Sequence, residues 1–269
     1  MSTFWANVTN YFSENFTKLG ETIASNLPYF LSFLGIIVGL FVIAFILEKI
    51  AQAKTGVKEK VFTTKKVAVI GIMSAISAIL MIFGEIPLFF APGFYKLDFS
   101  ELPILIATFA YGPATGIMME FIKIVLKVLF KGTSTAFVGE LANFAVGCSF
   151  ILTASVVYSF KKTKKGAIIA TIAGTLALTV FGTAFNAIYL LPAFAKLYGM
   201  PLDVILAMGS AINPLAKEGD IVSFVIACVA PLNLIKGISN SVVTLLVYKP
   251  LSKFVIKNEP AKKTVKVEK

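Results

Sequence analysis

The sequence predicts an all-α integral membrane protein, a six-helix transmembrane bundle with one additional N-terminal transmembrane helix. Three observations support this fold class. Of the 269 residues, 57% are hydrophobic and 14% are charged, whereas soluble domains carry about 25% charged residues. Mean hydropathy is +0.86. Several apolar runs reach the length of about 18 residues that marks a spanning helix.

The chain divides into an N-terminal extension, a six-helix membrane domain and a short tail. Residues 1–27 carry apolar side chains at helical spacing, which predicts an amphipathic segment on the extracellular membrane surface. Residues 28–50 are expected to form the additional N-terminal transmembrane helix, and residues 51–66 a cytoplasmic linker. The six-helix membrane domain then occupies residues 67–250, and a lysine-rich cytoplasmic tail follows at residues 251–269.

Breaks in the apolar pattern separate the six spans. Gly112 and Pro113 divide one long apolar run, because both residue types interrupt helices. Ser100 is predicted to be a helix N-cap with Glu101 in the first turn, and a short helix is expected to start near Pro201. The expected spans are residues 67–83, 101–111, 113–130, 139–160, 166–191 and 221–248.

The basic residues determine the expected orientation. All 25 are lysines, and they concentrate in the linker after the first span, in residues 161–165 and in the C-terminal tail. Because positively charged loops stay in the cytoplasm, the chain is predicted to be a multi-pass protein of the cell membrane. Its N-terminus is expected outside and its C-terminus in the cytoplasm. The absence of arginine argues against nucleic acid as a partner, since base contacts favour arginine.

Residue types that are missing exclude several kinds of chemistry. The chain has no histidine, and its two cysteines, Cys148 and Cys228, both fall inside apolar runs. This excludes zinc sites built from Cys and His, and nucleophile triads that depend on His. No metal and no resident cofactor are expected, and both cysteines are predicted to be buried apolar side chains.

A polar pair interrupts the last apolar run. Asn233 and Lys236 are three residues apart and share a helix face, and Pro231 just before them is expected to kink that helix. A lysine inside a spanning segment is costly to insert and indicates a functional site. Asn186 in the preceding span carries donors and an acceptor. The simplest prediction is one shared site for a polar small molecule in the outer half of the bundle.

Two other polar groups allow two interpretations each. Glu140 and Asn143, three residues apart, begin a span, where Glu140 either interacts with the helix N-terminus or contacts a ligand together with Asn143. Glu120, Lys123 and Lys127 lie on one helical face. Their expected structural arrangement is an ion pair between Glu120 and Lys123, with Lys127 reaching outward to the membrane surface. A functional role for the three is the alternative.

Small residues recur on one face of the second span. They are Ala68, Gly71, Ala75 and Ala78. Small side chains let two helices approach closely. This face is therefore either an internal packing surface or a docking surface for another membrane protein, and the spacing fits both.

Four segments follow one another in a characteristic order between residues 66 and 250. They are YKLDFSELP (95–103), GELANF (139–144), Asn186 with LLP (190–192), and NLIK (233–236). Together they resemble the riboflavin-specific substrate-binding (S) subunit of energy-coupling factor (ECF) vitamin transporters. The added N-terminal helix departs from that family's pattern.

The resemblance implies a six-helix bundle that binds riboflavin from outside, with its first connecting loop covering the pocket. It implies ligand contacts at Asn186, Asn233 and Lys236 and along the backbone of the loop residues Tyr95, Lys96, Leu97 and Asp98. It also implies that the small-residue face docks the ECF transmembrane coupling subunit. The chain contains no Gly-x-x-x-x-Gly-Lys-[Ser/Thr] segment, so ATP hydrolysis is expected in two partner ATPase subunits.

Other functions fit the sequence less well. A secondary transporter often shows internal repeats, and none is visible here. The chain is poorly equipped to be a membrane enzyme, because it has no histidine and few intramembrane carboxylates. A scaffold role would leave the intramembrane Lys236 unexplained. An S subunit for thiamine, biotin or folate is the remaining alternative.

Overall fold

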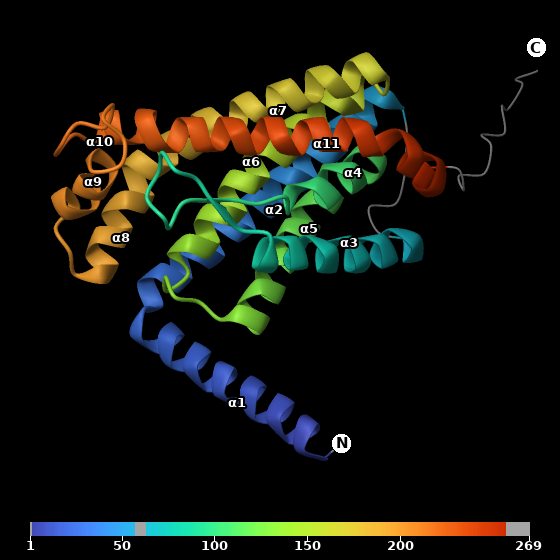
Figure 1. The fold of residues 1–269 in the computed structure, drawn as a ribbon. Helices are drawn as coiled ribbons and strands as arrows, with labels where there is room; N and C mark the ends of the chain where they lie inside the picture. Colours follow the sequence, from blue (N-terminus) through green and yellow to red (C-terminus); the bar gives the residue numbers. More distant parts are fainter. Residues whose placement is uncertain (1, 57–62, 257–269) are drawn as a thin grey trace, which may run out of the picture.

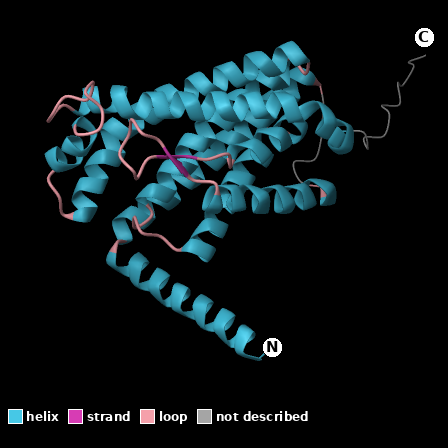
Figure 2. Cartoon of the chain, in the orientation of Figure 1, coloured by secondary structure: helices cyan, strands magenta, loops and turns pink. Residues whose placement is uncertain are grey.

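The computed structural model describes residues 2–56 and 63–256, which are mostly helical (Figure 2). The helices are α1 (Ser2–Ser25), α2 (Leu27–Thr55), α3 (Thr64–Phe83), α4 (Glu101–Tyr111), α5 (Pro113–Lys131), α6 (Val138–Phe160), α7 (Lys164–Phe185), α8 (Leu191–Tyr198), α9 (Leu202–Ser210), α10 (Ile221–Phe224) and α11 (Ala230–Ile256). Two π-helical turns, η1 (Asn186–Leu190) and η2 (Val225–Val229), join α7 to α8 and α10 to α11. A small antiparallel hairpin pairs β1 (Ile86–Pro87) with β2 (Lys96–Leu97).

Within the described residues, five continuous helical segments are long and apolar enough to cross a membrane. They are Leu27–Lys54, Thr64–Phe83, Val138–Phe160, Lys164–Tyr198 and Ile221–Val247. Helix α4 has 11 residues and α5 carries several charged side chains, so neither fits a simple apolar span. Both pack inside the bundle, where α5 contacts α3, α4 and α6. The structure therefore confirms the predicted all-α membrane fold.

Helix α4 is short because the chain before it dips into the bundle. The segment from Glu85 to Ser100 crosses the helices before α4 begins (Figure 1), and its last part, including Leu97, Asp98 and Ser100, is buried. Ser100 lies beside Lys123, near the middle of α5, with Oγ 3.3 Å from Nζ. Helix α4 therefore starts deep in the protein, and its N-terminus lies among charged side chains rather than in water.

The two ends of the bundle differ in character. At one end, Lys54 lies over the ring of Phe160 at 5.3 Å, and Lys66 lies over the ring of Tyr111 at 5.8 Å. This lysine end gathers the basic segments of α2, α3 and the α6–α7 connection. The opposite end, called the loop end here, carries the hairpin, the loop of residues 132–137 and helices α8 to α10 (Figure 1).

Prolines lie close to a π turn in two of the long helical segments. The span predicted to end at residue 191 continues to Tyr198, because the π turn η1 precedes Pro192 and carries the chain past it. A proline removes one backbone donor, and a π turn accommodates that loss. The second π turn, η2, ends two residues before Pro231, so the structure places an irregular turn where the kink ahead of Asn233 was predicted. The short helix expected near Pro201 is α9.

The N-terminal extension packs on one side of the bundle. Phe33, Ile37 and Ala44 of α2 are buried in a core that they share with α5 and α6. Near the lysine end, Glu48 accepts a hydrogen bond from the backbone N–H of Ala114 at 3.3 Å. A carboxylate at this position stabilises the N-terminus of α5. The side chains of residues 1–5 and 8, and the parts of the expected linker and tail at 57–62 and 257–269, lie outside the described residues.

The small-residue face of α3 divides into two parts. Ala68, Gly71 and Ala75 are exposed on the outside of the bundle, whereas Ala78 is 4% exposed and packs inward. Exposed isoleucines, among them Ile72 and Ile76, lie beside them. The structure therefore brings three of the four predicted residues to an outer face and assigns Ala78 to the core.

Candidate ligand-binding site

A cavity of about 680 Å³ opens at the loop end. Its walls come from the segment before α4, the end of α5, the 132–137 loop, α6, η1, α8, α9 and α11. This volume lies within the range of about 300–1,000 Å³ that is usual for small-molecule sites. Polar side chains from several of these elements converge on it, so the cavity is the candidate binding site.

One wall is built around a hydrogen bond between the loop and the kinked helix. The hydroxyl of Tyr95 donates to Asn186 Oδ1 at 2.7 Å, and Asn186 Nδ2 donates to the Gly182 carbonyl at 2.7 Å. Burial raises the pKa of Tyr95, which keeps its hydroxyl protonated as a donor. The Tyr95 ring packs against Phe94 and Phe224. Asn186 is thus oriented by the loop as well as by its own helix.

Asn233 faces the cavity with a free donor. Its side chain is 4% exposed, and within the described residues its Nδ2 has no hydrogen-bond partner. A buried amide without a partner is costly, so this position is suited to a ligand acceptor. Gly182 makes room for it, because a Cβ there would lie 2.5 Å from Asn233 Nδ2.

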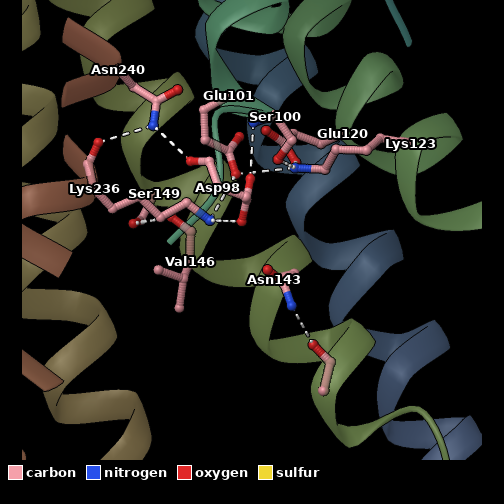
Figure 3. A network of polar contacts seen from close by, with 11 residues as sticks. Asp98, Ser100, Glu101, Glu120, Lys123, Asn143, Val146, Ser149, Lys236 and Asn240 are labelled. Carbon is pink, nitrogen blue, oxygen red and sulfur yellow. Dashed lines mark hydrogen bonds and ion pairs between the residues drawn. The ribbon is translucent and has the colours of Figure 1, made fainter. Parts of the chain in front are cut away.

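Lys236 joins the last helix to the loop that precedes α4. Its Nζ lies 2.9 Å from Asp98 Oδ2 and 3.5 Å from Glu101 Oε1 (Figure 3). One turn farther along α11, Asn240 Nδ2 donates to the Asp98 carbonyl at 3.2 Å. Burial alone would raise the pKa of Asp98, but the ammonium groups of Lys236 and Lys123 and the hydrogen bond from Ser100 together outweigh burial and hold that pKa below its usual value.

A second buried lysine lies behind this pair. Lys123 Nζ is 2.7 Å from Glu120 Oε2 and 3.0 Å from Glu101 Oε1, and all three side chains are fully buried (Figure 3). The predicted Glu120–Lys123 ion pair is confirmed, and Glu101 extends it. Together with the contacts of Asp98 and Lys236, these ion pairs join three carboxyl groups (Asp98, Glu101 and Glu120) to two lysines. The cluster therefore has one carboxyl group more than it has lysines.

Ser100 occupies the predicted N-cap position of α4, but the predicted capping hydrogen bond from its side chain is not formed. The side chain instead accepts from Lys123 at 3.3 Å. Asp98 Oδ1 accepts from the Ser100 backbone N–H at 2.9 Å. The cluster of charges, which is assembled from distant segments, competes successfully for the serine hydroxyl.

Glu140 anchors the opposite wall of the cavity. It pairs with Lys127, and it accepts hydrogen bonds from the hydroxyls of Thr133 and Thr135, each at 2.9 Å. Lys127 also donates to the Gly132 carbonyl at 3.2 Å. The expectation that Lys127 reaches outward is therefore wrong, because Glu140 offers it a buried partner. Glu140 is in the first turn of α6 and also lines the cavity.

The mouth of the cavity is crossed by a smaller ionic contact. Glu85 Oε2 lies 2.7 Å from Lys96 Nζ and 3.1 Å from Lys131 Nζ, which links the hairpin to the end of α5. Partial burial of Glu85 favours a higher pKa, but its bonds to the two lysines outweigh this effect and lower the pKa. All three side chains are partly exposed, so the contact contributes little free energy.

The cavity gathers eight of the nine predicted ligand residues. Tyr95, Lys96, Asp98, Glu140, Asn143, Asn186, Asn233 and Lys236 all line it. Leu97 does not line it, and its side chain is 7% exposed. Alternate residues of a strand face opposite sides, so the exposed Lys96 and the buried Leu97 of β2 point in different directions.

The sequence prediction missed several residues of the site. Thr135 lines the cavity, whereas Thr133 and Asn240 hydrogen-bond to the cavity residues Glu140 and Asp98 without lining it. None of the three was expected there, although Asn240 follows Asn233 and Lys236 at the i, i+3, i+7 spacing of one helix face. That spacing is a signal for Asn240. The two threonines lie in a loop, where no periodicity indicates which way a side chain faces.

Comparison with known proteins agrees with this geometry. A family model described as "ECF transporter, substrate-specific component" matches residues 65–248. The riboflavin transporter RibU of Staphylococcus aureus (strain TCH60) is 36% identical over 191 residues, which are 71% of this chain and 92% of the relative. The riboflavin transporter FmnP of Bacillus subtilis (strain 168) is 31% identical and covers 71% of this chain and 94% of its own length.

A solved structure gives the same result in three dimensions. The structure described as "Structure and mechanism of the S component of a bacterial ECF transporter" superposes with a TM-score of 0.55. It is 36% identical in sequence and covers 71% of this chain and 97% of its own chain. The matched residues 65–248 include every segment that lines the cavity. The chain therefore belongs to the family of ECF transporter substrate-specific components.

Proposed function

We propose that this protein captures riboflavin from outside the cell and presents it to an ECF energy-coupling module. The observation that carries the proposal is the convergence of Asn186, Asn233 and Lys236 on one cavity of suitable size. Riboflavin has a flat apolar ring with an imide edge, and amides offer both the donor and the acceptor that an imide needs. The relatives named as riboflavin transporters support the same ligand.

The energy for transport comes from partner subunits in this proposal. The chain has no phosphate-binding loop of the Gly-x-x-x-x-Gly-Lys-[Ser/Thr] type. Two ATPase subunits and a transmembrane coupling subunit would supply ATP hydrolysis and the conformational change. The loop of residues 85–99 would close over the vitamin, because it carries Tyr95 and Asp98 into the site.

The proposed orientation places the cavity toward the outside. Four lysines within residues 161–165 and further lysines of α2 and α3 lie at the lysine end. Positive charge marks the cytoplasmic side, so the loop end would face outward. The N-terminus would then be extracellular and the C-terminus cytoplasmic.

A riboflavin titration tests the ligand directly. The purified full chain in detergent is expected to quench flavin fluorescence saturably, at one riboflavin per chain, while thiamine and biotin leave the signal unchanged. Quenching is expected because the ring would lie against aromatic walls that include Tyr95 and Phe94. A folded protein that does not respond to riboflavin would overturn the ligand assignment.

The outer face of α3 is proposed to dock the coupling subunit. Ala75 is exposed and does not line the cavity, so Ala75→Leu is expected to leave riboflavin affinity unchanged. A leucine would keep the partner helix from close approach, and riboflavin uptake by cells with the complete transporter is expected to fall at least about tenfold. Ile168→Leu, at an exposed position of α7, is the control. Normal uptake by Ala75→Leu would make this face ordinary lipid-exposed surface.

A further inference from the structure

We infer that α1 and α2 form an N-terminal clamp that fixes the 132–137 loop, and with it one wall of the ligand cavity. The inference rests on the proposed function for its ligand, but its contacts are separate. The family match begins at residue 65, after both helices end. Even so, α2 packs on α5 and α6, the two helices that this loop connects. Figure 1 shows the joint between α1 and α2 beside that loop.

The end of the loop is held by two rings of α2. Phe137 is 4% exposed, and its ring lies 5.1 Å from Phe30 and 5.7 Å from Phe33, the latter stacked at 30°. Phe137 and Ala136 both have positive φ, 70° and 43°. Side-chain-bearing residues adopt this conformation at a cost, and it persists when surrounding contacts impose it. The rings of α2 supply such contacts.

The start of the loop is held by α1. Tyr11 donates a hydrogen bond to the Phe130 carbonyl at 2.5 Å, and the Phe12 ring lies edge-on to Phe130 at 5.7 Å. Phe130 is the next-to-last residue of α5. The extension thus contacts the chain on both sides of the 132–137 loop.

Hydrogen bonds carry this restraint from the loop into the cavity. Thr133 Oγ1 accepts from the Phe137 backbone N–H at 3.2 Å and donates to Glu140 Oε2 at 2.9 Å. Thr135 Oγ1 accepts from the Gly139 N–H at 3.0 Å and donates to the same oxygen. Glu140, Thr135 and Gly139 line the cavity. A shift of Phe137 would therefore move the groups that orient Glu140.

The clamp makes a prediction for the rate at which riboflavin leaves. The double variant Phe30→Ala/Phe33→Ala is expected to raise the dissociation rate about tenfold, since it removes two aromatic pairs, with little change in the association rate. The matched control is Leu31→Ala/Leu34→Ala, which truncates exposed residues of the same helix turn. The control is expected to stay within roughly twofold of wild type. Rates come from flavin fluorescence after dilution or chase.

A double-mutant cycle separates a positioning role from general destabilisation. In a Glu140→Gln background the clamp variant is expected to have an effect of less than roughly twofold, because the restrained wall no longer presents its carboxylate. In an Asn233→Ala background, on the opposite wall, the full tenfold effect is expected to remain. An equal effect in both backgrounds, or no effect in the parent protein, would overturn the inference. Phe33→Leu, which keeps apolar bulk, is used if the double variant fails to fold.

A measurement without riboflavin tests the clamp independently. Ala136→Cys introduces a thiol at a position that is 6% exposed, and the native Cys148 and Cys228 are buried. Maleimide labelling of this cysteine is expected to be slow in the parent and faster in Phe30→Ala/Phe33→Ala. Equal labelling rates would contradict the clamp. A protein that ignores riboflavin but shows the difference in labelling would overturn the proposed function and leave the clamp supported.

Discussion

Lys236→Met is expected to raise the Kd for riboflavin by roughly tenfold to a hundredfold. Removing one partner of a buried ion pair costs about 3–5 kcal/mol in all. A tenfold to hundredfold rise in Kd corresponds to about 1.4–2.8 kcal/mol of that cost appearing in binding, and the remainder is expected to destabilise the unbound protein. The Lys236 and Asp98 side chains are 9% and 6% exposed, so water screens their attraction little. Without Lys236, Asp98 loses the ion pair that keeps Tyr95 and its loop against the cavity.

A second variant distinguishes the two ways in which Lys236 can act. In Asp98→Asn/Lys236→Met the uncompensated carboxylate is gone, and Asn240 can still donate to the residue 98 carbonyl. If Lys236 acts only by holding the loop, most of the lost affinity is expected to return. If it also donates to riboflavin, the double variant stays weak. Fluorescence titration measures both, and an unchanged Kd for Lys236→Met would remove this lysine from the site.

Lys123→Met is expected to destabilise the folded protein by about 3–5 kcal/mol, whereas Glu120→Gln is expected to be neutral or stabilising. The asymmetry follows from the charge count. Without Lys123, the fully buried Glu120 loses its ion-pair partner, and Glu101 keeps only the longer 3.5 Å contact with Lys236. Without the Glu120 charge, Lys123 keeps Glu101 as its partner at 3.0 Å, and the excess carboxylate disappears.

Thermal unfolding in detergent, with and without riboflavin, measures this asymmetry. Lys162→Met changes an exposed lysine and serves as the control for loss of one positive charge. Similar losses for Lys123→Met and Glu120→Gln would mean that the cluster is not dominated by its excess carboxylate. Because neither Glu120 nor Lys123 lines the cavity, any change in riboflavin affinity is expected to follow the loss of stability.

Features that depend on local spacing could be predicted from the sequence. The helical bundle follows from the length and hydropathy of the apolar runs. The Glu120–Lys123 pair is three residues apart on one helix, and Asn233 and Lys236 share a face for the same reason. Pro231 predicts an irregular helix before Asn233, and the structure has a π turn there.

Contacts between distant segments could not be predicted in the same way. Lys236 and Asp98 are 138 residues apart in the chain, and nothing in local periodicity relates them. Lys127 was expected to reach the surface because Glu140 lies beyond its own helix. The inward packing of Ala78 and of Leu97 likewise depends on which neighbours surround α3 and β2.

The sequence by itself therefore determined the fold class, the approximate helix bounds and the polar faces of individual helices, because those properties depend on residues within a few turns of one another. Only the tertiary structure decided which polar faces meet, how many carboxylates share Lys123, and where the N-terminal extension packs. A buried charge or ring is stabilised by whichever group the fold brings beside it. For Phe137 that group is α2, which lies about 100 residues earlier in the chain.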